Sequence, residues 1–349
     1  MARWVEFLGR FGSRRTVVGL QVLVVMLTVV PVGAQSVKSL TKLTVGYSML
    51  NTDSMALYVA KERGLFRNYG LDVDLTFIPG GREHMQGIVA GSIPIGSSSG
   101  PIAIQAVAGE ADAVIILGFI NRFPYHFWAS PRIRRPEDLK GKRVAISGFG
   151  AASHAGVLFA LKQMGLYPKR DGITVVVIGP EPQRLAALRA GGVDGTVLTT
   201  VFAPIAKEAG LTLLADLTKL TLPWQHTALV TTRRYLRSQP QIVESVLEGI
   251  IEGYAYVLDP QNQRFVLRII ASYLKFDRVE QAEDGYKETI AMYEKKPYPT
   301  VQGVKNVIDF LKETDERMAR IKPEDVVDLG PLRKLDQAGF IDRLYAKRK

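Results

Sequence analysis

The residues best suited to chemistry in this chain are serines and glycines that lie between a predicted strand and a predicted helix. Residues 144–146 read as a buried strand, and the turn after them carries Ser147, Gly148, Gly150 and Ser153. Such a turn directs free backbone N–H groups and the positive end of the helix dipole at one spot, which favours an anion or a polar head group. The alternative is that the glycines only shape a tight turn and the serines only cap the helix.

This turn belongs to a longer alternation of strands and helices. In the N-terminal half, predicted strands at 43–47, 71–78, 93–96 and 114–117 alternate with predicted helices. That order indicates a mainly parallel α/β sheet, in which the loops at the carboxyl ends of the strands gather at a crevice where ligands bind. The polar or glycine-bearing loops at these ends supply further candidate ligand-binding residues: Asn51, Thr52, Gly81, Ser97, Ser98 and Ser99. Helix capping or turn formation is the alternative role of each.

A second domain is expected to begin in the segment at 121–136, which is rich in prolines, arginines and aromatic residues. The strand–helix pattern then repeats, with predicted strands at 144–146, 173–178, 193–198 and 213–215. Thr199 and Phe202 follow one of these strands and are candidates to face the same crevice. Residues 227–231 read as a strand that returns to the first domain. The helical remainder starts with an amphipathic helix at Pro240 and ends with a single helix around 332–344, and it is expected to pack on that domain.

Composition limits the classes of function. The chain has 349 residues, of which 47% are hydrophobic and 23% charged, and this suits a globular protein with two cores. It has no cysteine, which excludes thiolate catalysis, thiolate metal sites and a lipid-modified cysteine. The four histidines lie far apart without metal-ligand spacing, so neither a metal nor another cofactor is expected. The formal charge of +11 is scattered, without the basic runs typical of nucleic-acid binding.

The first residues predict a secretory signal peptide. Arg10, Arg14 and Arg15 precede an uncharged apolar run at 16–30, and the small residues up to Ala34 suit cleavage after that residue. We therefore expect a periplasmic protein released from its leader. An uncleaved anchor is the alternative, although the run is shorter than the ~20 residues of a membrane-spanning helix. The general and the twin-arginine export routes both stay open.

Several segments then resemble a known family. The segments at 60–66, 69–73, 138–145, 188–194 and 335–342 resemble the solute-binding proteins of ABC importers, in the branch for sulfonates, taurine, nitrate and thiamine-pyrimidine precursors. The likeness covers nearly the whole chain after the leader. It implies an α/β, two-lobed periplasmic-binding-protein type II fold with a central interlobe cleft, two crossing hinge strands and a helical C-terminal tail. Related members place the anionic group of the ligand at the turn that here contains Ser147, Gly148, Gly150 and Ser153.

The resemblance also implies an organisation and a function. After the predicted signal peptide (1–34), it divides the chain into the first part of lobe 1 (35–128), lobe 2 (129–226) and the return of lobe 1 (227–349). It implies a non-catalytic, monomeric protein that captures a small anionic or polar organic solute, such as a sulfonate, nitrate, a carboxylate or a pyrimidine. The protein would hand that solute to an inner-membrane permease with its ATPase.

The chain departs from the family pattern in two places, and two other functions stay open. Pro94 stands where many relatives carry an aspartate, and the cysteine cluster of the pyrimidine-synthase relatives is missing. The alternatives are an enzyme of that pyrimidine-synthase-like branch, or a ligand-sensing subunit for a membrane receptor.

Overall fold

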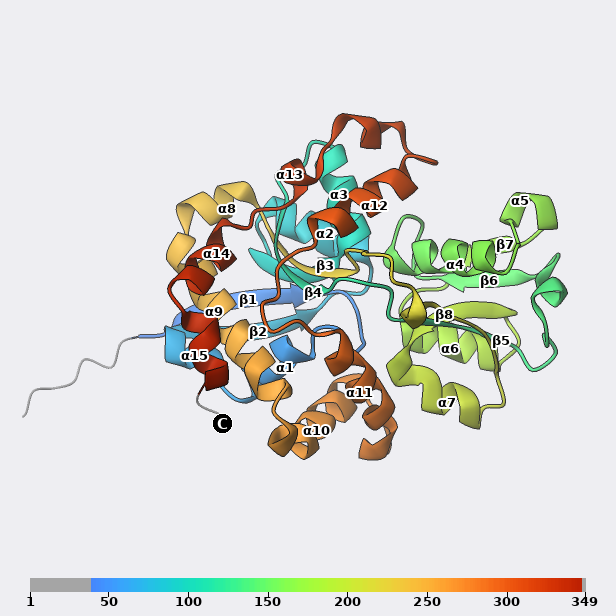
Figure 1. Cartoon of the computed structure of the whole chain (residues 1–349), viewed down its shortest axis with the longest axis horizontal. Helices are drawn as coiled ribbons and strands as arrows, with labels where there is room; N and C mark the ends of the chain where they lie inside the picture. The colour runs from blue at the N-terminus through green and yellow to red at the C-terminus, as the bar shows by residue number, and fades with distance from the viewer. Residues whose placement is uncertain (1–38, 347–349) are drawn as a thin grey trace, which may run out of the picture. The chain divides into compact units, whose positions relative to one another are not determined.

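The computed structural model describes residues 39–346, so the predicted signal peptide lies outside the described residues. It contains two five-stranded sheets with matching strand orders, β2-β1-β3-β10-β4 and β7-β6-β8-β5-β9. In Figure 1 the green segments from the middle of the chain form the second sheet and the helices around it. The blue segments and most of the orange-to-red segments belong to the first sheet and the helices around it. The strands of the first sheet are β1 (Thr41–Tyr47), β2 (Leu71–Phe77), β3 (Ile95–Ser99), β4 (Val114–Ile120) and β10 (Thr227–Thr231). Those of the second are β5 (Tyr125–Ala129), β6 (Arg143–Ile146), β7 (Thr174–Val177), β8 (Gly195–Thr199) and β9 (Thr212–Asp216).

Helices connect the strands and form the C-terminal part. Those before β10 are α1 (Met55–Glu62), α2 (Gly81–Ala90), α3 (Gly100–Ala108), α4 (Ala152–Gln163), α5 (Pro168–Asp171), α6 (Glu181–Arg189) and α7 (Ala203–Glu208). Those after it are α8 (Arg233–Ser238), α9 (Pro240–Val257), α10 (Gln263–Leu274), α11 (Glu283–Met292), α12 (Val301–Leu311), α13 (Pro323–Val326), α14 (Gly330–Gln337) and α15 (Phe340–Ala346). The predicted alternation of strands and helices is therefore confirmed.

Each sheet contains one strand that runs against the others. In the first sheet β1, β2 and β3 are parallel, and β10 pairs antiparallel with both β3 and β4. In the second sheet β6 is parallel to β7 and β8, and β5 pairs antiparallel with both β8 and β9. The predicted return of residues 227–231 to the first sheet is thus confirmed. Both sheets are therefore mixed. The antiparallel strand is the fourth of five in each, β10 in the first sheet and β5 in the second.

Three local expectations need correction. The segment at 121–136 was expected to be a passage between domains, yet it contains β5, which is buried along its whole length and belongs to the second sheet. The three serines were expected in a loop after a strand, but Ser97–Ser99 form the last part of β3. A single last helix was expected near the C-terminus. It is divided into α14 and α15 at Gly339, whose φ of 70° is left-handed and ends a helix readily.

The chain crosses between the two sheets twice, and the two crossing segments lie side by side. The first joins β4 to β5 and the second joins β9 to β10. The backbone N–H of Trp224 donates to the carbonyl of Asn121 (2.9 Å), and that of His226 donates to the carbonyl of Ile120 (2.9 Å). The rings of Phe123 and Trp224 stack with centroids 4.6 Å apart. The crossing is therefore a short backbone ladder covered by an aromatic pair.

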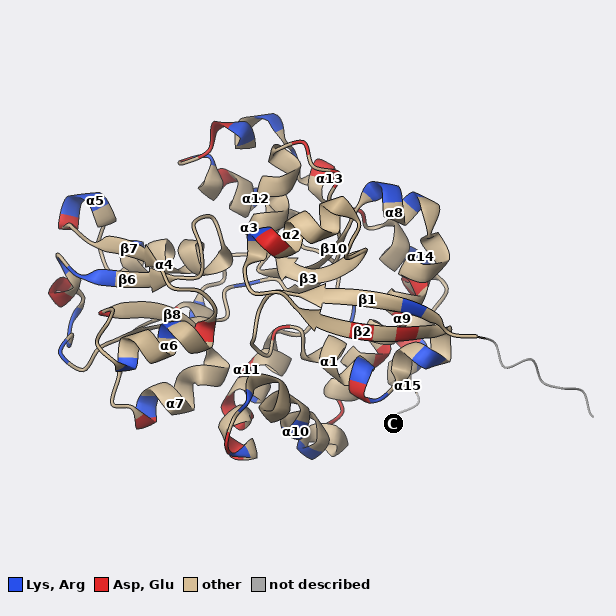
Figure 2. Cartoon of the chain, turned by 180° about the vertical axis from the view of Figure 1, so that it is seen from behind, with Lys and Arg blue, Asp and Glu red and all other residues tan. Residues whose placement is uncertain are grey.

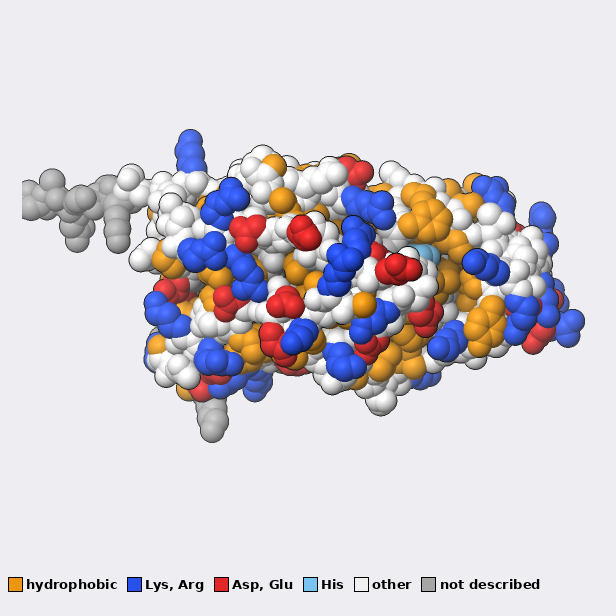
Figure 3. Space-filling model, turned by 90° about the horizontal axis from the view of Figure 1, so that it is seen from above, with side chains coloured by type: hydrophobic (Ala, Val, Ile, Leu, Met, Phe, Trp, Pro, Cys, Tyr) orange, Lys and Arg blue, Asp and Glu red, His pale blue; other side chains and the backbone are white. Residues whose placement is uncertain are grey.

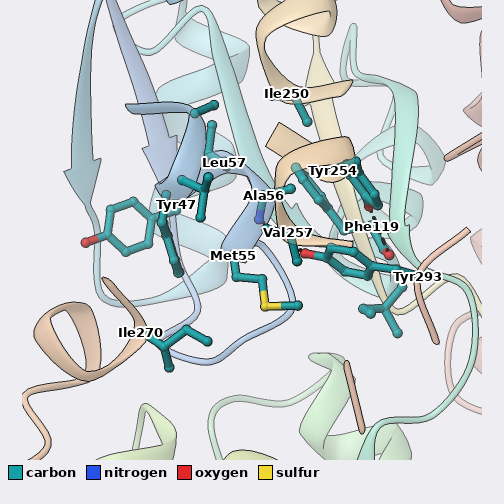
Figure 4. Packing of buried hydrophobic residues seen from close by; sticks show 14 of the residues in the cluster. Tyr47, Met55, Ala56, Leu57, Phe119, Ile250, Tyr254, Val257, Ile270 and Tyr293 are labelled. Carbon is teal, nitrogen blue, oxygen red and sulfur yellow. Dashed lines mark hydrogen bonds between the residues drawn. The ribbon is translucent and has the colours of Figure 1, made fainter. Parts of the chain in front are cut away.

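Helix α1 lies at the centre of the first core. Met55 and its neighbours in the helix are buried, and Figure 4 shows them beside the rings of Tyr254 and Tyr293. A Cβ added to Gly253 of α9 would lie 2.3 Å from the carbonyl oxygen of Ala56, so only glycine permits this close crossing of α1 and α9. The Tyr254 hydroxyl donates to the Phe119 carbonyl (3.2 Å) and so joins α9 to β4. This packing fixes the loop between β1 and α1.

The C-terminal helices cover mainly the first sheet, as expected, but α11 and α12 also contact the part of the chain that carries the second sheet. Helices α14 and α15 pack on α9, whereas α11 contacts the 3-10 turn Thr200–Phe202 that follows β8. A Cβ on Gly285 would lie 2.3 Å from the Cα of Val201, which shows how closely α11 approaches that turn. Phe310 of α12 also stacks on Phe159 of α4, with ring centroids 5.2 Å apart. Two tail helices therefore touch the part of the chain that carries the second sheet.

Charged side chains are dispersed over the molecule. Figure 2 shows Lys and Arg on elements of both sheets, and the face in Figure 3 interleaves them with Asp and Glu. Within residues 39–346, no helix combines the length and the apolar character that crossing a membrane requires.

Candidate functional site

A cavity of about 90 Å³ lies between loops of the two sheets. That volume can hold a small solute or several water molecules. The first sheet contributes Ser99 at the end of β3, and the segments that follow its strands contribute Ser48, Met49, Leu50, Gly80, Gly81 and Ile102. The part of the chain that carries the second sheet contributes Tyr125, Ser147, Ala151, Ala152, Ser153, Gly179, Pro180, Glu181 and Arg184. The lining therefore includes four of the twelve predicted binding residues, Gly81, Ser99, Ser147 and Ser153.

The predicted serine turn lies at the cavity, where it begins α4. The Ser153 hydroxyl accepts the Ser147 backbone N–H (2.9 Å) and hydrogen-bonds the Ser147 hydroxyl (2.7 Å). The backbone N–H groups of Ala152 and Ser153, both in the lining, have no acceptor among the described residues. The first turn of α4 thus presents two free donors and the positive end of its dipole to the cavity.

The glycines of that turn contact a different part of the molecule. Gly148 and Gly150 are not among the lining residues. The Gly150 carbonyl accepts Gln105 Nε2 of α3 (2.7 Å), and its N–H donates to His154 Nδ1 (3.1 Å). The neighbouring Phe149 carbonyl accepts Arg82 Nη2 of α2 (3.0 Å). The turn therefore connects α4 to two helices that pack on the first sheet.

Other predicted residues lie behind the cavity wall. The Ser97 hydroxyl bonds that of Ser54 (2.6 Å), and the Thr52 hydroxyl bonds that of Thr289 (2.6 Å). The Ser98 hydroxyl is buried without a partner inside β3, away from the lining. Phe202 is buried and packs edge-to-face on Phe276. These four predicted residues do not line the cavity.

Asn51 and Thr199 do not line the cavity, but both hydrogen-bond Glu181, a lining residue that sequence reasoning did not select. Asn51 Nδ2 donates to Glu181 Oε1 (3.2 Å). The backbone N–H and the hydroxyl of Thr199 both donate to Oε2, at 2.6 and 2.8 Å. Burial raises the pKa of the Glu181 carboxyl, although Arg184 and the Thr199 donors act in the opposite direction. Three donors from two distant segments therefore hold this carboxyl at the cavity.

Arg184 is the second lining residue that sequence reasoning missed. It is only 2% exposed. Its Nε donates to the Gly179 carbonyl (3.2 Å) and its Nη1 to the Thr196 hydroxyl (3.1 Å). Among residues 39–346, no hydrogen bond engages Nη2. Glu181 and Arg184 are three residues apart, which puts them on one helix face, but such spacing also fits a solvent-exposed pair.

A second buried polar group stands behind Asn51. His226 Nε2 lies 3.1 Å from Asp53 Oδ2, and that oxygen also accepts the Thr227 hydroxyl (2.7 Å) and Asn51 Nδ2 (3.2 Å). The Tyr125 ring, which lines the cavity, meets the His226 ring edge-to-face at 4.9 Å. Asn51 is thus a single amide that bonds two buried carboxylates. The part of the chain that the structure describes has no group of three or more His, Cys, Asp and Glu side chains suited to a metal ion.

The arrangement is suited to binding a solute. Ser48 and Ser99 are lining residues, and their buried hydroxyls have no partner among the described atoms. Together with the α4 amides and Arg184, they can satisfy the polar atoms of a small molecule removed from water. The described lining contains no histidine that could act as a base toward these serines.

Known proteins resemble this chain in sequence or in fold. A formylaminopyrimidine-binding protein of Halalkalibacterium halodurans is 22% identical over 234 residues, which is 65% of this chain and 70% of that protein. The periplasmic nitrate-binding protein of Synechocystis superposes with a TM-score of 0.74 at 16% identity, covering 86% of this chain and 89% of that one. The alkanesulfonate-binding protein of Xanthomonas axonopodis, bound to MOPS, gives 0.64 at 21% identity, covering 82% and 96%.

The structural matches establish the fold, because they cover more than four fifths of this chain and of each known protein. The two sheets with exchanged strands and the helical C-terminal region are those of the periplasmic binding proteins, as the resemblance implied. The family model named NMT1/THI5 like matches residues 51–263, more than half of the chain. This protein therefore belongs to the NMT1/THI5-like family.

Proposed function

We propose that the protein is the solute-binding component of an ABC importer. It captures a small anionic or polar organic solute in the cavity, without converting it, and delivers the solute to a membrane permease with its ATPase. The observation that carries this proposal is the cavity itself. Its polar lining comes from loops of both sheets, and several donors there have no other partner.

We further propose that the two sheets are the cores of two lobes. Lobe 1 comprises residues 39–120 and 227–346, and lobe 2 comprises residues 125–216, with the paired crossing segments as the hinge between them. This division starts lobe 2 earlier than the sequence suggested, because β5 pairs only within the second sheet. The protein works as a monomer in the periplasm, after removal of its leader.

The names of the relatives indicate the range of solutes. Nitrate, alkanesulfonates and formylaminopyrimidine are small and polar, and each offers acceptor atoms to donors such as those in the cavity. A bound solute stabilises the folded protein by about 2.7 kcal/mol when its concentration is 100 times its Kd. A thermal-shift screen of the protein without its leader, over nitrate, sulfonates, carboxylates and pyrimidines, therefore tests the proposal.

We expect one class to raise the melting temperature, to titrate with one molecule per chain in calorimetry, and to be recovered chemically unchanged. Ser99→Ala removes a lining hydroxyl and should weaken that binding by about 1 kcal/mol, roughly fivefold. Ser98→Ala is the matched control, since Ser98 is equally buried and unpartnered but lies outside the lining. The proposal fails if no class binds, or if the solute is converted.

A further inference from the structure

The cavity has one carboxylate and one guanidinium in its lining, and this pair bears on the kind of solute that it takes. Both side chains are buried, Glu181 at 6% and Arg184 at 2% exposure. The inference below rests on the proposed function, because it concerns the solute of that same cavity.

The surroundings of Glu181 are unfavourable for a plain anion. Asn51 joins the Glu181 carboxylate to that of Asp53, so two acidic groups lie around one amide. Glu181 Oε1 accepts a single hydrogen bond, from Asn51, and thus retains acceptor capacity. An anion placed against it would meet a like charge in a poorly solvated place, whereas an N–H group would complete its hydrogen bonding.

A different part of the lining offers donors. The free N–H groups of Ala152 and Ser153 begin α4, and Arg184 Nη2 has no acceptor among the described residues. The buried hydroxyls of Ser48 and Ser99 are also unpartnered. Oxygen or ring-nitrogen acceptors of a solute can take these donors.

We propose that the solute carries an N–H donor group as well as an acceptor group, and that Glu181 selects the donor group. The ammonium of an aminosulfonate or amino acid, or the amino group of an aminopyrimidine, would bond Glu181. The sulfonate, carboxylate or ring nitrogen of the same molecule would bond the α4 amides and Arg184. Glu181 is then the specificity-determining residue of the cavity.

Two matched pairs of probes test this proposal by calorimetry on the protein without its leader. The pairs are 3-aminopropanesulfonate with propanesulfonate, and 4-aminopyrimidine with pyrimidine. In the wild-type protein, at least one aminated probe should bind tenfold or more tightly than its partner without the amine. The pair that shows the difference distinguishes a zwitterionic solute from an aminopyrimidine.

Glu181→Gln should reduce that preference to about threefold or less, because an amide is a weaker acceptor than a carboxylate. Glu288→Gln is the control, since this half-buried carboxylate of α11 lies outside the lining and should keep the wild-type ratio. If Glu181→Gln does not fold, the wild-type ratios alone decide. Equal or tighter binding of propanesulfonate, pyrimidine or nitrate overturns the inference but leaves the proposed function standing. Binding by none of these probes also overturns it, while the broader screen judges the proposed function.

Discussion

The stability of the protein should depend on pH through His84, a residue outside the cavity. His84 on α2 is 0% exposed, and neither of its ring nitrogens has a hydrogen-bond partner among the described residues. The ring lies against two strands of the first sheet, since a Cβ on Gly46 or Gly96 would approach its Nε2 to 2.4 or 2.3 Å. Burial lowers the pKa of His84 from 6.5 to about 4, because the charged ring would be poorly solvated there.

The direction and size of the effect follow from these two pKa values. The unfolded chain binds a proton at His84 below pH 6.5, whereas the folded protein does so only near pH 4. The contribution of the neutral His84 ring to the free energy of unfolding is therefore fully present above pH 6.5 and is lost as the pH falls toward 4. Between pH 7.5 and pH 5 the loss is about 2 kcal/mol by linkage.

Urea unfolding of wild type and His84→Leu at pH 7.5 and pH 5 measures this loss. The wild type should lose about 2 kcal/mol more than the variant between the two pH values, because leucine does not titrate. Met85→Leu, a buried and volume-conserving change on the same helix, is the control and should keep the wild-type pH dependence. An equal loss in wild type and His84→Leu would show that His84 is not held neutral, and would refute the reasoning.

Two other predictions concern the contacts that join the parts of the chain carrying the two sheets. Gly150→Ala should destabilise the protein by about 1–2 kcal/mol, because Gly150 has a φ of 79° and a Cβ there would lie 2.4 Å from Gln105 Oε1. Gly148→Ala, with open space at its Cβ, should stay within about 0.5 kcal/mol, and similar losses for both variants would contradict the described turn. Asn51→Ala should cost about 1–3 kcal/mol in urea unfolding, since it removes a buried donor from Glu181, and an unchanged midpoint would argue against that bond.

The regular parts of the fold were predictable from sequence because their signals are local. The apolar strand at 144–146 and the helical spacing after it predict β6 and α4, and both are present. The strand β5 was not predicted, because Tyr125–Ala129 is buried on both faces and shows no polar alternation beside Pro124. Its inclusion in the second sheet depends on pairing with β8, about seventy residues later.

The candidate site was predictable only in part, for the same reason. The serine turn lies at the cavity because the end of a strand and the start of a helix define it locally. The sequence around Glu181 and Arg184 does not predict that these two side chains are buried. Their place depends on partners such as Asn51, which is 130 residues from Glu181. Charged residues are usually solvated, so the sequence alone offered no reason to place either one in the lining of a cavity.

The backbone ladder between the crossing segments limits how a solute could enter. The hydrogen bonds from Trp224 to Asn121 and from His226 to Ile120 join the two crossing segments. Each crossing segment continues into a strand of the first sheet at one end and into a strand of the second sheet at the other. Sliding one sheet past the other would break this ladder. A swing of one sheet relative to the other about the long axis of the ladder would preserve it. Such a swing must first break three hydrogen bonds, which are those from Gln105 to Gly150, from Arg82 to Phe149 and from Asn51 to Glu181. If the proposed lobes open by this swing, a solute can enter or leave only after these hydrogen bonds break, while the backbone ladder stays intact.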